Sequence, residues 1–331
     1  MKDTQDVFVQ KTNNRVAEDK FYREVLEGLT KQQKSLPSKY FYDAEGDRLF
    51  QKIMECPEYY LTDCELEIFI DRTADLAATI GFNHEPFDII ELGAGDGTKT
   101  IYLLEYLANR QMDFRYLPVD ISVNILTELE LLVHARLPNV NIQVLAGEYL
   151  DMIAEARILS DRRKVILFLG GNIGNLTPRE AIDFYREISQ QLQPGDIMVT
   201  GFDLMKNPLI VRAAYDDAGG ITKEFNLNLL QRINKELGAD FDINLFEHYC
   251  SYNPENGACK SYLVSLVQQE VSFEDTTVGF EEGETIWMEI SQKYSPDRIV
   301  ALAASSGFEV VTNLKDKKGW FTDSVWRVVE Q

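Results

Sequence analysis

The chain has 331 residues, with 33 basic and 54 acidic side chains and a formal net charge of −21 at neutral pH. This charge argues against DNA or RNA as a partner, and no apolar run is long enough to span a membrane. Hydrophobic residues make up 45% of the chain, which is ordinary for a soluble globular protein of one large or two ordinary domains.

The N-terminal part is predicted to be mainly helical. Residues 16–32 carry apolar side chains at helical spacing, and residues 47–54 and 63–80 are predicted to form further helices. An aromatic stretch, residues 36–43, separates the first two helices and begins at a proline.

Strands and helices alternate from residue 87 onward. The predicted strands cover residues 87–91, 114–120, 140–145, 164–170 and 196–201, and the intervening helices cover residues 98–109, 122–135, 150–157 and 178–193. Parallel strands joined by right-handed helical crossovers form a doubly wound sheet. We therefore predict an α/β fold with a doubly wound parallel sheet.

The alternation stops after Asp203. Residues 209–237 are predicted to be largely helical, whereas strands are predicted within residues 246–272 and again at 285–290. A helix at 296–306 and strands at 308–311 and 324–329 then supply further elements for the sheet.

This interruption predicts two domains. The sheet domain is expected to comprise residues 63–205 and 294–331. A smaller α+β domain, which would bind the substrate, is expected to comprise residues 1–62 and 206–293.

The most informative motif follows the first predicted strand, where Ile89 to Thr100 spell Ile-Ile-Glu-Leu-Gly-Ala-Gly-Asp-Gly-Thr-Lys-Thr. Glycines at such a turn let a ligand approach the backbone closely. The third glycine of a dinucleotide fingerprint would fall at Thr98, and the Gly-Lys-Ser/Thr of a P-loop is missing. The motif instead resembles the first motif of class I methyltransferases, which binds S-adenosylmethionine (SAM). A glycine-rich turn without a ligand is the alternative interpretation.

Each of the first three strand ends offers a contact for SAM. Gly93 and Gly95 provide the close turn, and Asp120 ends the second strand, where a carboxylate accepts hydrogen bonds from a ribose diol. After the third strand, Glu148 would accept a hydrogen bond from the adenine amino group, and Tyr149 would flank the ring.

Two further features complete this predicted cofactor site. The fourth strand ends in a glycine loop, residues 170–175, beside the expected methyl donor. Lys99, one turn into the following helix, would neutralise the methionine carboxylate of SAM, or would simply occupy a solvated helix surface.

Segments outside the sheet order resemble the family of L-histidine Nα-methyltransferases, which make histidine betaine (hercynine), the precursor of ergothioneine. The resemblance spans nearly the whole chain, and its N-terminal aromatic block is specific to this family. The matching segments are residues 36–43, Gly46 with Leu49-Phe50, 57–60, 168–170, 173–176, Asp203-Leu204, 214–217, Phe225-Asn226, 239–241 and 289–291.

The resemblance implies roles for the substrate site. Asn175 and Tyr215 would hold the amine and carboxylate of the amino acid, while Tyr59, Glu289 and Ser291 would contact the imidazole ring. A glutamate that accepts an imidazole N–H would discriminate against phenylalanine and leucine, because their side chains leave buried polar groups unpaired.

The resemblance also implies that two aromatic residues line the wall near the reacting nitrogen. Tyr42 and Phe50 suit a methylated ammonium, because aromatic faces attract cations, although they would equally build a small core. On this resemblance, Asn175, Tyr215 and Tyr42 form the catalytic set. Ser261 departs from the family pattern, which has a larger apolar residue there, and a smaller residue would admit another amino acid such as tryptophan.

The predicted function is therefore SAM-dependent Nα-methylation, extending to trimethylation, of free L-histidine, with S-adenosylhomocysteine as the product of SAM. The alternatives are methylation of another amino acid or amine metabolite, a non-catalytic SAM-binding protein, and a nicotinamide oxidoreductase. The last is disfavoured by Thr98 and by the lack of an obvious hydride-transfer residue set.

The remaining composition predicts a cytoplasmic monomer that acts on a small molecule. The four cysteines form no CxxC pair and the chain has only three histidines, so neither a metal site nor a disulfide framework is expected. The first residues lack the hydrophobic core of a secretory signal, and neither nucleic acid nor a membrane is an expected partner.

Overall fold

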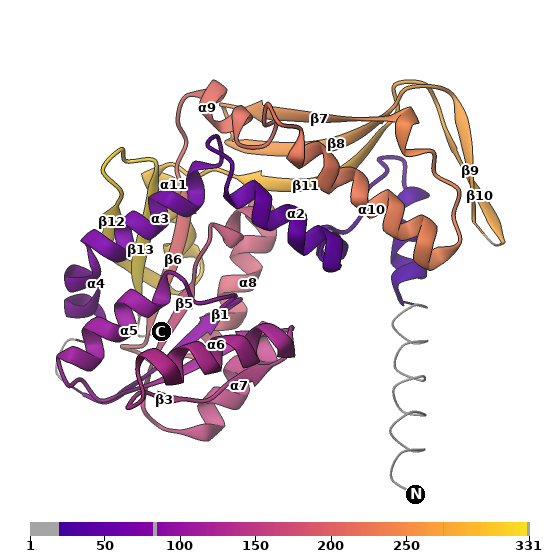
Figure 1. The fold of residues 1–331 in the computed structure, drawn as a ribbon. Coiled ribbons are helices and arrows are strands. Elements are labelled where there is room, and N and C mark those ends of the chain that lie inside the picture. Colours follow the sequence, from indigo (N-terminus) through magenta and orange to yellow (C-terminus); the bar gives the residue numbers. More distant parts are fainter. Residues whose placement is uncertain (1–19, 82–84, 274, 330–331) are drawn as a thin grey trace, which may run out of the picture. The chain divides into compact units, whose positions relative to one another are not determined.

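A computed structural model describes residues 20–81, 85–273 and 275–329, and its contacts divide the chain into two compact units (Figure 1). The sheet unit comprises Tyr60–Lys206 and Gln292–Gln331. The second unit comprises Met1–Tyr59 and Asn207–Ser291. Each unit therefore combines two separate stretches of the chain.

The sheet unit is built on an eight-stranded sheet with the order β12-β13-β6-β5-β1-β2-β3, and β4 also pairs with β2. Strands β1, β2, β5 and β6 pair in parallel, whereas β13 runs antiparallel to β6 and β12. The predicted parallel sheet is confirmed, and its last two strands, β12 and β13, form an antiparallel hairpin. Its strands are β1 (Phe87–Leu92), β2 (Phe114–Asp120), β3 (Asn141–Ile142), β4 (Leu145–Ala146), β5 (Arg163–Phe168), β6 (Ile197–Asp203), β12 (Phe308–Lys315) and β13 (Phe321–Val328).

The helices of this unit form two packed groups around the sheet strands. The first contains α3 (Tyr60–Asp71), α4 (Thr73–Ile80) and α5 (Thr100–Asn109), which contact one another. Helix α8 (Pro178–Gln191) contacts α7 (Tyr149–Leu159) and α11 (Pro296–Ser305), while α6 (Val123–Arg136) packs on β2. Helix α8 begins with a capping box, in which Thr177 and Glu180 satisfy each other's backbone N–H groups.

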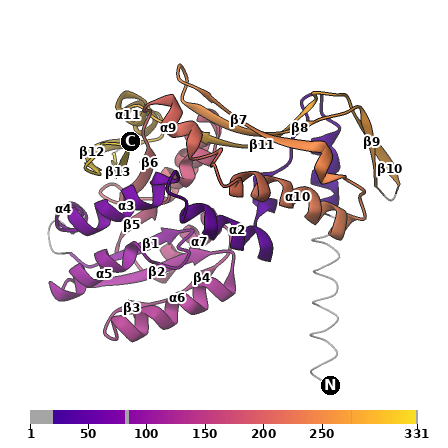
Figure 2. The ribbon, with the colours of Figure 1, turned by 45° about the horizontal axis from the view of Figure 1, so that its top comes forward.

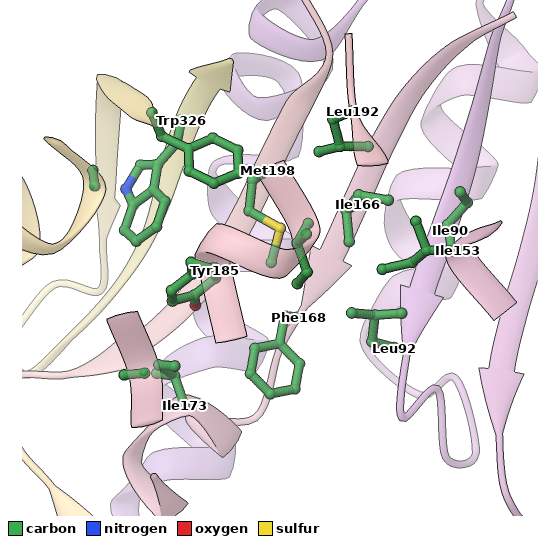
Figure 3. Packing of buried hydrophobic residues seen from close by; sticks show 14 of the residues in the cluster. Ile90, Leu92, Ile153, Ile166, Phe168, Ile173, Tyr185, Leu192, Met198 and Trp326 are labelled. Carbon is green, nitrogen blue, oxygen red and sulfur yellow. The ribbon is translucent and has the colours of Figure 1, made fainter. Parts of the chain in front are cut away.

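The core of the sheet unit joins the sheet strands to α8 (Figure 3). Ile90, Ile166 and Met198 extend from β1, β5 and β6, and all three side chains are fully buried. Tyr185 of α8 packs against Trp326 of β13 with ring centroids 4.9 Å apart. This continuous burial explains why the strands are nearly unbroken apolar runs, as is typical of parallel sheets covered on both faces.

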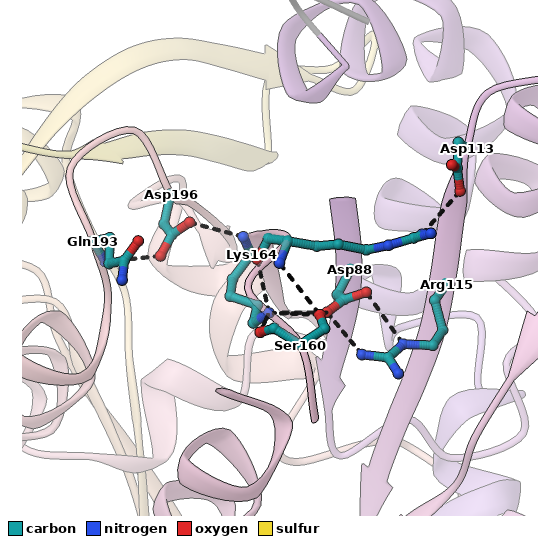
Figure 4. A network of polar contacts seen from close by, with 8 residues as sticks. Asp88, Asp113, Arg115, Ser160, Lys164, Gln193 and Asp196 are labelled. Atoms are coloured by element: carbon teal, nitrogen blue, oxygen red, sulfur yellow. Dashed lines mark hydrogen bonds and ion pairs between the residues drawn. The ribbon is translucent and has the colours of Figure 1, made fainter. Parts of the chain in front are cut away.

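A buried aspartate, Asp88, interrupts the apolar run of β1 near its start (Figure 4). The buried Asp88 carboxylate pairs with Lys164 Nζ at 2.9 Å and with the Arg115 guanidinium at 2.9 Å, and it accepts a hydrogen bond from Ser160 Oγ at 2.6 Å. Burial acts to raise the pKa of Asp88, but these donors outweigh it and the pKa lies below its ordinary value. The partners thus compensate for burying the charge.

The second unit contains a three-stranded sheet with the order β11-β8-β7 and a separate hairpin of β9 and β10. Helix α10 packs against β7 and α2, and it runs along the three-stranded sheet (Figure 2). A buried cluster that includes Phe21, Leu49, Leu229 and Ile286 holds these elements together. The elements are residues 20–29 (helix), η1 (Ser38–Phe41), α2 (Ala44–Met54), α9 (Pro208–Ala213), α10 (Ile221–Leu237), η4 (Ile243–Leu245), β7 (Phe246–Asn253), β8 (Ala258–Ser265), β9 (Gln269–Phe273), β10 (Thr276–Phe280) and β11 (Thr285–Gln292).

Two predicted elements are divided in the structure. The helix expected over 63–80 is two helices, because Arg72 leaves the helical conformation and Thr73 begins a new helix with Asp75 in its first turn. The strand expected over 140–145 is split into β3 and β4, which pair with β2 in one register. Pro118 of β2 lies between the residues that pair with β3 and those that pair with β4. Because proline has no N–H to donate, the pairing is interrupted at this point.

Other differences are smaller. Strand β10 was not predicted, and α2 begins three residues earlier than expected because Asp43 caps it by accepting a hydrogen bond from the Gly46 N–H at 2.8 Å. The start of the helix predicted over 16–32 lies outside the described residues.

No helix among the described residues is long and apolar enough to cross a membrane. The same residues contain no His, Cys, Asp or Glu cluster that could hold a metal ion. All four cysteines are free thiols, and Cys250 and Cys259 lie with their sulfurs 3.5 Å apart.

Candidate active site

The turn after β1 has the backbone shape that the glycine motif predicts. Gly93, Gly95 and Gly97 all adopt positive φ, at 68°, 55° and 68°. The Gly93 and Ala94 N–H groups donate to the Val119 carbonyl of β2 at 2.8 and 3.1 Å, which anchors the turn to the sheet. A Cβ added at Gly95 would meet nothing within 4 Å, so open space lies directly beside this backbone.

The ends of β2 and β4 bring three more predicted residues to this turn. The Asp120 carboxylate accepts hydrogen bonds from the N–H groups of Ser122 at 2.9 Å and Gly95 at 3.4 Å. Tyr149 begins α7 directly after Glu148, and a Cβ on Gly93 would lie 2.8 Å from the Tyr149 hydroxyl. Burial, with Asp120 and Glu148 nearby, raises the pKa of Tyr149 to about 12, so this hydroxyl stays protonated.

Lys99 has a definite partner rather than a solvated surface position. Its ammonium pairs with Glu65 of α3, a fully buried residue that was not predicted. Burial acts to lower the pKa of Lys99, but Glu65 and further carboxylates nearby outweigh it and hold the pKa above its ordinary value. The Glu65 oxygens also accept the Gly170 N–H at 2.8 and 2.9 Å. Glu65 thus ties the helix after the glycine turn to the loop after β5.

Two more buried acids lie near this ion pair. Glu91 at the end of β1 accepts hydrogen bonds from Thr100 and Tyr116, and its burial raises its pKa to about 7. Asp323 of β13 is also fully buried, and burial together with Glu65 raises its pKa well above the ordinary value.

The loop after β5 contains the predicted substrate residue Asn175. Gly170 and Gly171 have positive φ, and residues Asn172–Asn175 form the short helix η3. Asn175 is exposed at the end of η3. The Asn172 side chain is near both Gly93 and Gly170, since a Cβ on either glycine would lie 3.8 and 3.4 Å from its Nδ2. The Asn172 side chain therefore lies near both glycine loops, a position that was not predicted.

The remaining predicted residues belong to the second unit, where four aromatic rings form a continuous series. The Tyr42 and Phe50 centroids are 5.7 Å apart, those of Phe50 and Tyr59 are 6.3 Å apart, and those of Tyr59 and Tyr215 are 6.2 Å apart. Phe225 of α10 contacts both Tyr42 and Phe50 at about 6 Å. Phe50 also packs against the core of this unit, so its two interpretations are compatible.

Tyr215 and Ser291 meet directly, since their hydroxyl oxygens are 2.7 Å apart in a buried hydrogen bond. Ser291 and Glu289 are two residues apart on β11 and so share one face of the strand. Ser261 on the neighbouring β8 is 1% exposed and lies opposite Cys250 of β7. The structure thus joins Tyr42, Phe50, Tyr59, Tyr215 and Ser291 in one series of contacts. For Glu289 and Ser261 it gives positions on β11 and β8.

The missed residues depend on tertiary contacts. A possible signal for Glu65 was its position among the apolar residues Leu61, Cys64 and Ile68 of a helix, where a charged side chain needs a partner. The sheet-unit residues fit SAM, because the open backbone at Gly95 adjoins the Asp120 carboxylate, which suits a ribose diol. Glu148, directly before Tyr149 at the start of α7, offers a second carboxylate that suits adenine.

Comparison with known proteins covers almost the entire chain. A family model described as "Histidine-specific methyltransferase, SAM-dependent" matches residues 21–328. The chain is 35% identical over 303 residues to a histidine N-alpha-methyltransferase of Mycolicibacterium smegmatis, covering 91% of this chain and 90% of that protein.

Two fungal proteins are also similar. The ergothioneine biosynthesis protein 1 of Schizosaccharomyces pombe is 28% identical over 283 residues, which cover 84% of this chain and 37% of that protein. A 4-dimethylallyltryptophan N-methyltransferase of Arthroderma benhamiae is 27% identical over 239 residues, which cover 70% of this chain and 68% of that protein.

Proposed function

Because the chain belongs to the family of SAM-dependent, histidine-specific methyltransferases, we propose that it methylates the α-amino nitrogen of free L-histidine with SAM as methyl donor. The observation that carries the proposal is the 35% identity to a histidine N-alpha-methyltransferase over nine tenths of both chains. S-adenosylhomocysteine is the second product.

The sheet unit would hold the donor. SAM supplies a methyl group on a positively charged sulfur, and the protein must aim that group at the acceptor nitrogen. Gly93, Gly95 and Tyr149 would border the ligand, Asp120 would bind the ribose diol, and Glu148 would accept a hydrogen bond from adenine. Lys99 would add its positive charge near the methionine carboxylate.

The acceptor amine requires a second kind of contact. An α-ammonium group is protonated at neutral pH, and the proton must leave before the nitrogen lone pair can attack. Asn175, Tyr215 and Tyr42 offer polar groups without a formal negative charge, so they would orient the neutral amine without stabilising its ammonium form. These three residues are the proposed catalytic set.

The second unit would select histidine by its ring. Glu289 would accept an imidazole N–H, while Ser291, already hydrogen bonded to Tyr215, would donate to or accept from the ring. Tyr59 and Phe50 belong to the aromatic series and would line the space around the substrate. An apolar amino acid has no ring N–H to donate to the Glu289 carboxylate, so it would lack this contact.

Three successive transfers would give histidine betaine, the hercynine of the ergothioneine pathway. Each methylation makes the nitrogen bulkier. After the third transfer the nitrogen is a quaternary ammonium with a permanent positive charge. Aromatic faces such as Tyr42 and Phe50 tolerate such a cation because their π electrons attract it.

Another aromatic amino acid, such as tryptophan, is the second candidate. The small Ser261 is buried on β8, and a relative is named for N-methylation of a tryptophan derivative. Against this alternative, Glu289 and Ser291 are both polar residues suited to an imidazole.

A substrate panel tests both candidates. The purified protein is incubated with SAM and each of the twenty amino acids, and the products are analysed by mass spectrometry. We expect up to three added methyl groups on histidine, at the α nitrogen. Transfer to tryptophan instead of histidine would contradict the proposed substrate but keep the reaction class.

The Glu289→Ala variant tests recognition of the ring. We expect KM for histidine to rise about tenfold or more, while Kd for SAM from calorimetry changes little. Glu270→Ala is the control, because Glu270 is an exposed acid of β9 in the same unit. Equal weakening of histidine and SAM binding would contradict the assigned role.

The proposal includes a cytoplasmic monomer that needs neither nucleic acid nor a membrane. Four free thiols support a reducing compartment. Light scattering on the purified protein would measure its mass against the 37.9 kDa of one chain.

A further inference from the structure

The chain passes between its two units at three places, after Tyr59, after Lys206 and after Ser291. Close to each crossing, within two residues on the sheet-unit side, one side chain bonds to Asp203. The same carboxylate therefore has a partner at all three crossings. The three side chains are Tyr60, Lys206 and Lys293.

The contacts at Asp203 are close and use both of its oxygens. The Tyr60 hydroxyl donates to Oδ1 at 3.0 Å and to Oδ2 at 2.8 Å. Lys293 Nζ lies 2.6 Å from Oδ2, and Lys206 Nζ pairs with Oδ1. Lys206 also donates to the Tyr60 hydroxyl at 2.9 Å and lies over its ring, 4.2 Å from the centroid. The four side chains therefore form one connected cluster, the Asp203 junction.

The backbone joins the same segments. The Tyr294 N–H donates to the Asp203 carbonyl at 2.9 Å, and the Met205 N–H donates to the Tyr294 carbonyl at 2.9 Å. Leu204 and Tyr294 accordingly form a parallel bridge. The segments that leave β6 and enter α11 are thus fixed side by side by backbone and side chains together.

The junction is deeply buried. Asp203 is 3% exposed and Lys293 is fully buried. Removing ions from water is costly, and replacing such a pair by apolar side chains often stabilises a protein. A buried carboxylate that holds two ammonium groups is therefore weak evidence for a role in stability alone. Its place at all three crossings is what requires an explanation.

The residues beside the junction belong to the proposed substrate site. Tyr59 directly precedes Tyr60, and Ser291 lies two residues before Lys293. We propose that Asp203 is a positioning residue for histidine, because it fixes the chain segments from which Tyr59 and Ser291 extend. It acts without contacting the substrate, and the inference rests on the proposed function of that site.

The test compares two buried carboxylates. Asp203→Asn keeps the shape of the side chain but removes the charge that faces Lys206 and Lys293. Asp88→Asn does the same to a buried carboxylate of β1 that pairs with Lys164 and Arg115 and lies away from the crossings. Stability, Kd for SAM, and kcat and KM for histidine are measured for both variants and for the unaltered protein.

We expect Asp203→Asn to raise KM for histidine about tenfold while Kd for SAM stays within about twofold. Asp88→Asn should lose comparable stability but keep the KM of the unaltered protein. The inference is wrong if both variants shift KM alike, or if Asp203→Asn weakens SAM binding as much as histidine binding.

A second variant, and the activity of the unaltered protein, decide the remaining cases. Should Asp203→Asn fail to fold, Tyr60→Phe decides, because it removes one hydroxyl from the junction and should raise KM for histidine by a smaller factor; an unchanged KM would overturn the inference. Failure of the unaltered protein to methylate histidine overturns the proposed function, and the inference with it. Histidine methylation with an unaffected Asp203→Asn variant overturns the inference alone.

Discussion

Lys99 has a structural task in addition to its proposed contact with SAM. Its ammonium is the counter-charge of Glu65, whose side chain is almost completely buried, and Glu65 in turn holds the Gly170 N–H. A residue that only bound the cofactor could be replaced without harm to the ligand-free protein. Lys99 is different, because its loss leaves a buried carboxylate without its cation.

The Lys99→Met variant should therefore destabilise the ligand-free protein. We expect the free energy of unfolding in denaturant to fall by about 3 kcal/mol, in addition to weaker SAM binding. Lys223→Met, which breaks an exposed pair with Glu247, should change stability by less than about 1 kcal/mol. Equal stability of the two variants would show that Glu65 does not depend on Lys99.

Glu91 gives the protein a pH-dependent stability. Its pKa is about 7 in the folded chain against an ordinary value of 4.5, so the folded state retains a proton that the unfolded state releases between these values. Stability from this group is complete below pH 4.5 and is lost as pH rises to 7, a total of about 3 kcal/mol.

Glu91→Gln removes this dependence. Unfolding free energies are measured from pH 4.5 to 8. Across this range the free energy of unfolding of the variant should rise by about 3 kcal/mol relative to that of the unaltered protein. Glu309→Gln, at a half-exposed pair with Arg327, should follow the unaltered curve. A constant difference between the Glu91→Gln and unaltered curves would mean that Glu91 is ionised throughout.

At the scale of elements, two glycine turns allow the stability cost of a left-handed backbone to be measured apart from the effect on SAM binding. Gly95 and Gly319 both have positive φ, 55° and 65°, and a Cβ on either would meet no atom within 4 Å. Only Gly95 belongs to the proposed cofactor site. Alanine at each position should therefore cost a similar amount of stability, about 1 kcal/mol, because both must adopt a left-handed conformation.

Binding should distinguish the two turns. Gly95→Ala places a methyl group in the space proposed for SAM, and we expect Kd to rise about tenfold or more by calorimetry. Gly319→Ala should bind SAM as the unaltered protein does. If Gly95→Ala also keeps its affinity, SAM does not approach the backbone at this turn.

Most of the sheet could be predicted because its signal is local. Long apolar runs identify β1, β2, β5 and β6, and their order along the chain with helices between them implies parallel pairing. The split between β3 and β4 depends on Pro118 of the neighbouring strand, so the apolar pattern of residues 140–145 alone did not reveal it.

The candidate site divides in the same way. Gly93, Asp120 and Tyr149 follow strand ends, which converge at one edge of a parallel sheet, so their proximity could be predicted. Glu65 could be noticed only as a charge among apolar residues, because Lys99 and Gly170 lie more than 30 residues away in the sequence. The role of Asp203 depends on Tyr60 and Lys293, which are also more than 30 residues away. The position of Asn172 could not be predicted, because it depends on how the two glycine loops run in three dimensions.

At the scale of the whole molecule, neither unit is a continuous piece of chain. The second unit draws its core from both of its stretches, with Phe21, Val25 and Leu49 from the first and Leu229 and Ile286 from the other. Removing the first stretch therefore removes part of a shared core, whereas the sheet unit keeps every strand.

A chain that begins at Tyr60 should retain SAM binding by calorimetry and lose histidine methylation. Its near-ultraviolet circular dichroism should show loss of ordered aromatic side chains from the second unit. A chain that begins at Lys20 keeps all the core residues named above and should behave as the 331-residue chain does. Histidine methylation by the shorter chain would contradict a role for Tyr42, Phe50 and Tyr59.

The divided second unit also affects synthesis on the ribosome. Its first stretch ends at Tyr59, and its remaining stretch begins at Asn207, roughly 150 residues later. At about 5–20 residues per second, Phe21, Val25 and Leu49 wait on the order of ten to thirty seconds before their partners on α10 are translated. During that interval the nascent chain presents apolar side chains to solvent, which makes residues 20–59 a natural target for a chaperone at the exit tunnel.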